Sequence, residues 1–268
     1  MDIRLFAAGI VLASGLSAPA EARIICTIVA DAWSDEVFLE KGDCATRVTP
    51  ASTFKVPLAV MGYDSGFLED DTQPVLPYME GYADWGGDAW RQPTSPKRWM
   101  EFSVVWFSQQ ITQFLGAEQL RDYADAFGYG NADMTGDPGK DNGLERAWIA
   151  SSLKISPREQ VEFLKKLVNH ELPVSADAMD GAMQIVERRD IADGWGVQGK
   201  TGMAYPRQAD GNFDYNRPWG WYVGWARRDE RTVVFARLVQ DEKKQEPRTS
   251  LRARDSILKE LPGILATD

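Results

Sequence analysis

Short apolar and β-branched segments lie near both ends of the chain and predict strands there. Near the start, residues 23–30 and 36–40 have this pattern, and the turn residues Asp31, Ser34 and Asp35 between them predict a hairpin. The pattern returns later in three further segments, at 195–201, 219–227 and 232–239. The chain therefore begins and ends in strand-rich regions.

Helical signals dominate the middle of the chain, from about residue 49 to residue 189. The clearest is a capping box in which Ser156 is the N-cap, Pro157 takes the first helical position and Glu159 closes the box ahead of apolar residues at helical spacing. The same spacing predicts further helices over 97–115, 117–127, 176–188 and, after the last strand, 249–261.

The order of these elements is strands, helices, strands, helix. The simplest packing joins the strands from both ends into one antiparallel sheet that carries the last helix, with the all-helical block on the other side and a cleft between them. We therefore expect an α/β fold of the α+β type. No repeat, low-complexity segment or long linker interrupts the sequence, so residues 23–268 are expected to form a single domain.

Residues 1–22 have the pattern of a bacterial secretory signal. Arg4 precedes an apolar run from Leu5 to Leu16, and Ala20-Glu21-Ala22 is a small-x-small cleavage site. We expect a signal peptide, a mature chain that begins near Arg23, and a soluble periplasmic protein with no membrane anchor. The alternative is an uncleaved anchor, although the apolar run is too short to span a bilayer.

The two cysteines, Cys26 and Cys44, lie on either side of the predicted hairpin. An oxidising compartment would let them pair in a structural disulfide, and the alternative is two free thiols. No cluster of cysteine and histidine exists to make either one a metal ligand, so we expect no metal site.

Acidic residues outnumber basic ones, 40 to 30, which gives a formal net charge of −10. This balance argues against nucleic acid or an anionic membrane as the main partner, because phosphate binding needs clustered Lys and Arg. A small-molecule partner is the better expectation.

The chain has one histidine, His170. It follows the capping-box helix, where a histidine commonly interacts with the negative end of the helix dipole. A Ser-His-Asp triad would have to use this residue, and catalytic zinc sites built on several histidines are excluded. A hydrolase of this sequence must therefore activate its nucleophile by other means, and lysine is the remaining candidate.

A Ser-x-x-Lys pair meets this need, because positions i and i+3 of a helix share one face. The pattern alone is weak, since about one copy is expected by chance in a chain of this length. It occurs three times, as Ser52/Lys55, Ser151/Lys154 and Ser256/Lys259. Only the first pair lies in apolar surroundings that would bury the lysine.

Burial matters because desolvation lowers the pKa of a lysine and makes a neutral amine available as a base or for further reaction. Pro50 and Ala51 indicate that Ser52 lies at a helix N-terminus, where free N–H groups can stabilise an oxyanion. Ser52 is therefore the candidate nucleophile and Lys55 its partner.

Two further motifs support this interpretation. Lys200-Thr201-Gly202 ends a predicted strand, where Lys200 supplies positive charge and Gly202 lets a substrate lie close to the strand edge. Ser103 begins Ser-Val-Val on the predicted helix 97–115 and offers a second hydroxyl. Taken alone, Ser103 is more simply a small polar residue within a helix.

Together the motifs resemble those of the class D serine β-lactamases, the oxacillinases, which belong to the penicillin-recognising serine enzymes. The resemblance runs from about Cys26 to Leu261 and rests on five motifs in order: Ser-Thr-Phe-Lys at 52–55, Ser-Val-Val at 103–105, Tyr-Gly-Asn at 129–131, Lys-Thr-Gly at 200–202 and Trp-Tyr-Val-Gly at 221–224. It implies hydrolysis of the β-lactam amide of penicillins and related antibiotics, and hence antibiotic resistance.

The resemblance also implies roles for single residues. Lys55 would be N-carboxylated by carbon dioxide or bicarbonate, with no dissociable cofactor, and would act as general base for both half-reactions, held by Trp148. Ser52 would form the acyl-enzyme, the backbone N–H groups of Ser52 and Met203 the oxyanion hole, and Ser103, hydrogen-bonded to Lys200, would protonate the departing nitrogen.

The remaining expectations concern the bound antibiotic. Candidates for contact with it are Thr201, Gly202, Met203, Val104 and Tyr129. An arginine of the last helix would bind the substrate carboxylate; Arg252 is preferred, with Arg248 and Arg254 as alternatives. The chain would act as a monomer or homodimer. A transpeptidase and a β-lactam sensor that stays acylated are the rival interpretations.

Overall fold

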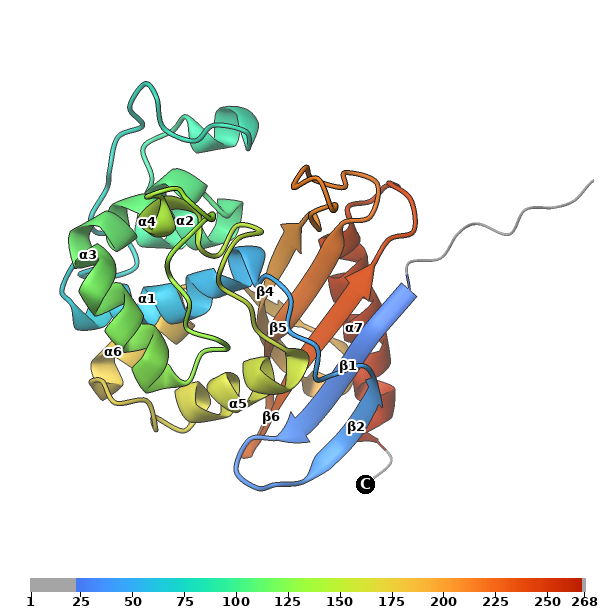
Figure 1. The fold of residues 1–268 in the computed structure, drawn as a ribbon. Coiled ribbons are helices and arrows are strands. Elements are labelled where there is room, and N and C mark those ends of the chain that lie inside the picture. Colours follow the sequence, from blue (N-terminus) through green and yellow to red (C-terminus); the bar gives the residue numbers. More distant parts are fainter. Residues whose placement is uncertain (1–22, 267–268) are drawn as a thin grey trace, which may run out of the picture.

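A computed structural model of the protein describes residues 23–266, in which six strands form one sheet with a helix on one side and a helical block on the other (Figure 1). The strand order is β2-β1-β6-β5-β4-β3, and all neighbours are antiparallel. The strands are β1 (Arg23–Asp31), β2 (Val37–Gly42), β3 (Arg188–Asp190), β4 (Gly196–Ala204), β5 (Trp219–Arg228) and β6 (Arg231–Gln240). The predicted joining of strands from both ends of the chain is confirmed.

The central strands are buried on both faces, which explains why β6 is apolar almost throughout. Along β6, Val233 and Phe235 face the C-terminal helix α7 (Thr249–Leu265), whereas Val234 and Ala236 face the helical block. This alternation is the period-2 geometry of a strand with two covered faces. The predicted position of the last helix on the sheet is therefore confirmed.

The helical block lies against the other face of the sheet and is built around buried aromatic side chains. Trp99, Trp106 and Trp148 are each 1% exposed or less, and they share one apolar cluster with Trp221 and Trp225 of β5. Its helices are α1 (Lys55–Asp64), α2 (Pro96–Phe102), α3 (Val105–Phe127), α4 (Gly143–Arg146), α5 (Pro157–Val168) and α6 (Ala176–Gln184). The capping box at the start of α5 is present as predicted.

The helix expected over 97–115 is wrong in its middle. Ser103 has a left-handed backbone (φ 59°, ψ 36°), so α2 ends there and α3 begins two residues later. Gly116 (φ 75°, ψ 169°) has a non-helical backbone, so α3 consists of two helical segments that meet at this residue, as the separate helices expected over 97–115 and 117–127 predicted. The helix expected over 176–188 also stops early, at Gln184, because residues 188–190 pair with β4 as the edge strand β3.

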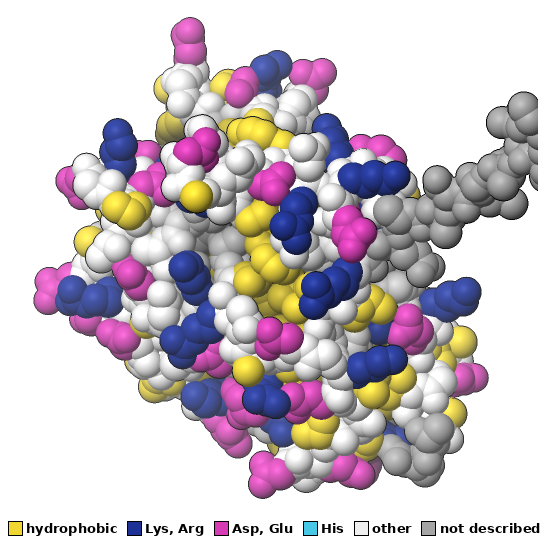
Figure 2. Space-filling model, turned by 45° about the vertical axis from the view of Figure 1, so that its right-hand side comes forward, with side chains coloured by type: hydrophobic (Ala, Val, Ile, Leu, Met, Phe, Trp, Pro, Cys, Tyr) yellow, Lys and Arg dark blue, Asp and Glu magenta, His cyan; other side chains and the backbone are white. Residues whose placement is uncertain are grey.

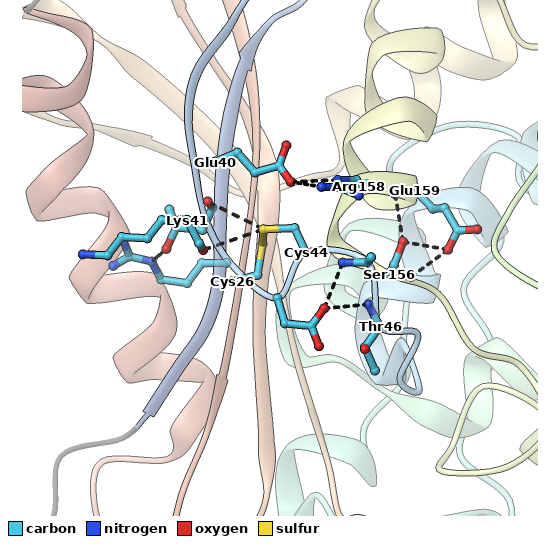
Figure 3. Close-up of a disulfide and its surroundings, with 12 residues drawn as sticks. Cys26, Glu40, Lys41, Cys44, Thr46, Ser156, Arg158 and Glu159 are labelled. Atoms are coloured by element: carbon cyan, nitrogen blue, oxygen red, sulfur yellow. Dashed lines mark hydrogen bonds and ion pairs between the residues drawn. A yellow bond between two sulfur atoms is a disulfide. The ribbon is translucent and has the colours of Figure 1, made fainter.

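A disulfide joins Cys26 of β1 to Cys44, just beyond β2 (Figure 3). Around it, the backbone N–H of Arg158 donates to the carbonyl of Cys44, and the Arg158 side chain donates to Glu40 at 2.7 Å. These contacts fasten the hairpin to the start of α5, and thus the sheet to the helical block. The pairing of the two cysteines is confirmed.

The surface carries both signs of charge. On the face shown in Figure 2, Lys and Arg side chains are interspersed with Asp and Glu.

Within residues 23–266 no helix is long and apolar enough to cross a membrane. The signal peptide expected over residues 1–22 lies outside the described part of the chain.

Candidate active site

Ser52 lies in a 3-10 turn, Ala51–Phe54, that runs directly into α1. The backbone N–H of Lys55 donates to the carbonyl of Ser52, and in a 3-10 turn residues i and i+3 lie one above the other. Ala51, the residue before Ser52, has a left-handed backbone (φ 50°). Unfavourable backbone conformations of this kind cluster at functional sites. Ser52 is half-buried and faces the cleft between the sheet and the helical block.

Lys55 is 1% exposed, as its apolar surroundings predicted. Its ammonium nitrogen, Nζ, is buried and has no hydrogen-bond partner among the residues described. Burial lowers the pKa of Lys55 well below its usual value, and the nearby Lys200 lowers it further. The lysines of the two other Ser-x-x-Lys pairs, Lys154 and Lys259, are exposed.

The strand β4 forms the opposite wall of the site. Lys200 is 5% exposed, and burial lowers its pKa to about 8, an effect that Glu187 opposes. Its Nζ donates to the carbonyl of Thr201 at 3.4 Å; the expected hydrogen bond to Ser103 is not formed among the described residues. Gly202 allows close packing, because a Cβ there would lie 2.8 Å from the Pro50 carbonyl oxygen. The small residue thus lets the strand approach the serine turn itself.

The third wall is the junction between α2 and α3, where Ser103 faces the cleft. A left-handed conformation is unfavourable for a residue with a Cβ, and it is held here by hydrogen bonds from the N–H groups of Ser103 and Val104 to the carbonyl of Trp99. The sequence placed Ser103 within a helix. The break in the helix is what brings its hydroxyl to the same cleft as Ser52.

The cleft that these walls enclose has a volume of about 390 Å³. Trp148 forms part of its lining and stacks on Phe54, the residue before Lys55, with ring centroids 5.4 Å apart. Of the residues expected from the sequence, the lining includes Ser52, Ser103, Trp148, Thr201, Gly202 and Met203.

Two expected contacts with substrate are not supported by the structure. Val104 and Tyr129 have no exposed surface and do not line the cleft. Val104 is a core residue beside the α2–α3 break. The hydroxyl of Tyr129 donates to Gln160 at 3.4 Å, and its ring lies against Phe54. Tyr129 therefore supports the serine turn from behind.

The three candidate arginines at α7 differ in what they contact. Arg252, the residue preferred from the sequence, donates to the buried carboxylate of Asp241 and to the carbonyl of Pro247, and it is not among the residues lining the Ser52 cleft. Arg248, at the N-terminus of the helix, does line that cleft. Arg254 lines a different pocket, behind Lys200.

Trp85 and Ile149 also line the cleft, although neither was predicted from the sequence. Trp85 is 62% exposed, although large aromatic residues are normally buried. It belongs to the long segment between α1 and α2, which shows no helical or strand periodicity, so only an aromatic residue in a polar loop could have drawn attention to it. His170 does not line the cleft; its Nε2 lies 2.8 Å from an Asp180 carboxylate oxygen.

Comparisons with known proteins agree with this geometry. The chain is 44% identical to β-lactamase OXA-9 of Klebsiella pneumoniae over 240 residues, which cover 90% of this chain and 88% of that protein. It is 38% identical to β-lactamase OXA-1 of Escherichia coli over 182 residues, 67% of this chain and 64% of that one. The crystal structure of the OXA-427 class D β-lactamase superposes with a TM-score of 0.84 at 46% identity, covering 90% and 98% of the two chains.

A serine turn, a buried lysine and a Lys-Thr-Gly strand around one cleft are the features of a penicillin-recognising serine enzyme. Residues 26–263 accordingly match the family described as penicillin binding protein transpeptidase domain. Within that superfamily the chain belongs to the class D β-lactamases, and it is a serine hydrolase.

Proposed function

We propose that this β-lactamase opens the lactam amide through an acyl-enzyme on Ser52, with N-carboxylated Lys55 as the general base. The observation that carries the proposal is the buried Nζ of Lys55, which has no hydrogen-bond partner among the described residues and lies one turn from Ser52. An unpartnered buried amine is costly to a folded protein, so a functional reason for it is expected.

The surroundings of Lys55 suit carboxylation. Only a neutral amine reacts with carbon dioxide, and burial lowers the pKa of Lys55 toward the range where the neutral form is populated. The amine nitrogen bonds to the carbon of carbon dioxide and loses one proton, so that a neutral side chain becomes an anion. Lys200, whose charge disfavours an ammonium at Lys55, favours that anion. When bound, the carboxyl group supplies the base that takes a proton from Ser52 and later from water.

The other residues of the cleft position the substrate. The Ser52 oxygen attacks the lactam carbonyl, and the backbone N–H groups of Ser52 and Met203 are proposed to stabilise the oxyanion. The Ser103 hydroxyl delivers a proton to the departing nitrogen as the carbon–nitrogen bond breaks, and Ser103 regains a proton from the one that the base took from Ser52, which leaves the base free for the second step. Water then attacks the ester carbonyl, Ser52 recovers its proton, and the ring-opened acid leaves.

The substrate carboxylate is proposed to bind where the cleft has positive charge and hydroxyl donors. Thr201 and Arg248 line the cleft from two sides, and Lys200 lies next to Thr201 in β4. A guanidinium can hold a carboxylate by two parallel hydrogen bonds. Arg248 is therefore the better candidate for this role than Arg252, which is engaged with Asp241.

Residues 1–22 would be a cleaved signal peptide, and the remainder one catalytic domain in the periplasm. Penicillins and related β-lactams would be the substrates, with carbon dioxide or bicarbonate as the only further requirement. The enzyme would act as a monomer or homodimer.

Turnover of a chromogenic cephalosporin tests the proposal against its rivals. We expect steady hydrolysis by the full chain, stimulated by bicarbonate at mildly acidic pH and abolished in Lys55→Ala. Lys259→Ala, which removes an exposed lysine from a second Ser-x-x-Lys pair, is the matched control and should behave as the unaltered enzyme. A single stoichiometric burst without turnover would instead indicate a sensor or transpeptidase. If Lys55→Ala kept full activity and its rate did not depend on bicarbonate, the carboxylated base would be excluded.

A further inference from the structure

Two loops meet beside the cleft, far from each other in sequence. One, residues 129–156, includes the short helix α4 and carries Trp148 and Ile149 of the cleft wall; the other, residues 205–218, joins β4 to β5. We propose that Arg207 of the second loop is a positioning residue, which holds the Trp148 segment in the conformation that keeps carboxylated Lys55 enclosed. This inference rests on the proposed function of Lys55.

Arg207 uses its whole guanidinium to join the two loops. Nη2 donates to the Asp137 carboxylate at 2.7 Å, and Nε donates to the carbonyl of Ala150 at 3.0 Å. Nη1 donates to the carbonyl of Gly211 at 2.9 Å, within the loop of Arg207 itself, and the group lies 4.4 Å from the ring centroid of Phe213. A planar group with five N–H donors can make all these contacts, which a lysine cannot.

Asp137 is also held by contacts within its own segment of the chain. Its carboxylate accepts a hydrogen bond from Ser151 at 2.8 Å and one from Asn142 at 3.2 Å, and it lies 3.3 Å from Arg146. Its side chain is 19% exposed, so screening by water is reduced. Arg207 therefore binds a rigid acceptor, and the loop after β4 is held at a defined place.

Ala150 is the point where this arrangement acts on the cleft wall. Its backbone is left-handed (φ 51°), which is unfavourable for any residue with a Cβ. Its carbonyl accepts from Arg207, and its N–H donates to Thr49 Oγ1 at 3.0 Å. Thr49 in turn donates to the carbonyl of Trp148 at 2.9 Å. The unfavourable conformation is thus held from both sides, two residues after Trp148.

Loss of the Arg207 contact would let Ala150 relax to an ordinary conformation. Trp148 would then shift from its stacked position on Phe54, the residue before Lys55, and looser packing there would let water reach the buried Lys55 Nζ. Water stabilises the ammonium form of lysine, which does not bind carbon dioxide. Loss of the contact between the loops should therefore raise the bicarbonate concentration that is needed to carboxylate Lys55.

The test measures Lys55 carboxylation by NMR with ¹³C-bicarbonate, alongside kcat. We expect Arg207→Ala to need about tenfold more bicarbonate for half-carboxylation, which matches the cost of a left-handed conformation. Ala150→Gly in the same chain should restore both the bicarbonate requirement and kcat, since glycine takes this conformation freely. Arg217→Ala, which removes an exposed arginine of the same loop, should change neither.

The outcomes separate this inference from the proposed function. If the unaltered enzyme gives no carbamate signal, the proposed function fails, and restoration of kcat by Ala150→Gly in Arg207→Ala still decides whether Arg207 positions the loop. If Arg207→Ala matches the unaltered enzyme in bicarbonate requirement and kcat, or if Ala150→Gly restores neither, Arg207 has no positioning role.

Discussion

At the scale of single residues, Arg248 and Arg252 show how neighbours on one helix differ in role. Both are arginines of one short segment, and the sequence favoured Arg252, whereas the structure favours Arg248. They differ in their contacts. Arg252 forms an ion pair with the fully buried carboxylate of Asp241, whereas Arg248 lines the cleft. A cation already paired with a buried carboxylate is not available to a ligand.

The two arginines should therefore fail in opposite ways when replaced. Arg248→Ala should lower kcat/KM by about tenfold or more, the usual cost of a lost charge-assisted hydrogen bond, with the Tm unchanged. Arg252→Ala should reduce the free energy of unfolding by about 3 kcal/mol, because it leaves the Asp241 carboxylate buried without its cation. Steady-state kinetics and thermal unfolding of both variants check this, and the reverse pattern would return the substrate role to Arg252.

Lys200 should give the enzyme an alkaline limit. Its pKa is lowered to about 8 because burial disfavours the ammonium form, so the cation proposed to attract the substrate carboxylate is present below that pH and lost as the pH rises through it. We expect kcat/KM to fall above about pH 8. Lys200→Arg, which stays charged, should lack this fall, and a profile of the unaltered enzyme that stays level to pH 9 or so would contradict the assignment.

At the scale of elements, the sequence predicted those with strong local signals and missed those set by long-range contacts. The α5 start at Ser156 has its signal within four residues and was predicted correctly. The break at Ser103 has none, because residues 97–115 carry continuous helical periodicity and the left-handed turn is fixed by packing in the folded chain. The Lys-Thr-Gly strand was found from its motif, but its closeness to the serine turn depends on the tertiary fold.

The Ser103 break allows its hydroxyl and its backbone to be tested separately. Both Ser103→Ala and Ser103→Gly remove the hydroxyl, so both should slow acylation by about a hundredfold or more, as expected for loss of a general acid. Only Gly relieves the left-handed conformation, so Ser103→Gly should be more stable than Ser103→Ala by about 1 kcal/mol. Stopped-flow acylation and urea unfolding measure the two effects, and an Ala variant that acylates normally would exclude the proton role.

At the scale of the whole molecule, the disulfide should matter for stability and not for chemistry. Cys26 and Cys44 are 18 residues apart, and closing such a loop stabilises a fold by about 3 kcal/mol through the unfolded chain. The double variant Cys26→Ala/Cys44→Ala should have a free energy of unfolding lower by this amount, measured by urea unfolding. Its kcat should stay unchanged, because neither residue lines the cleft. Reductant should weaken the unaltered enzyme and leave the variant as it is; equal stability of the two oxidised proteins would refute the expectation.

The overall architecture was predictable because it follows from the order of elements. Strands at both ends and helices between them leave few ways to cover both faces of a sheet, and the structure has the simplest one. The order of the elements does not show which distant loops lie beside the cleft. Trp85 and Arg207 lie in segments without periodicity, and their positions follow from contacts between distant parts of the chain.

The position of β1 between β2 and β6 has a consequence for how the chain is made. Thr27 pairs with Arg237, 210 residues further along. During synthesis the first strand therefore has no long-range partner until almost the whole polypeptide has emerged, and early collapse around it cannot produce the native sheet. Contacts of such large sequence separation form slowly, because closing so long a loop costs entropy before any pairing compensates for it. We therefore expect the full sheet to form only late in folding, once β6 is available to pair with β1.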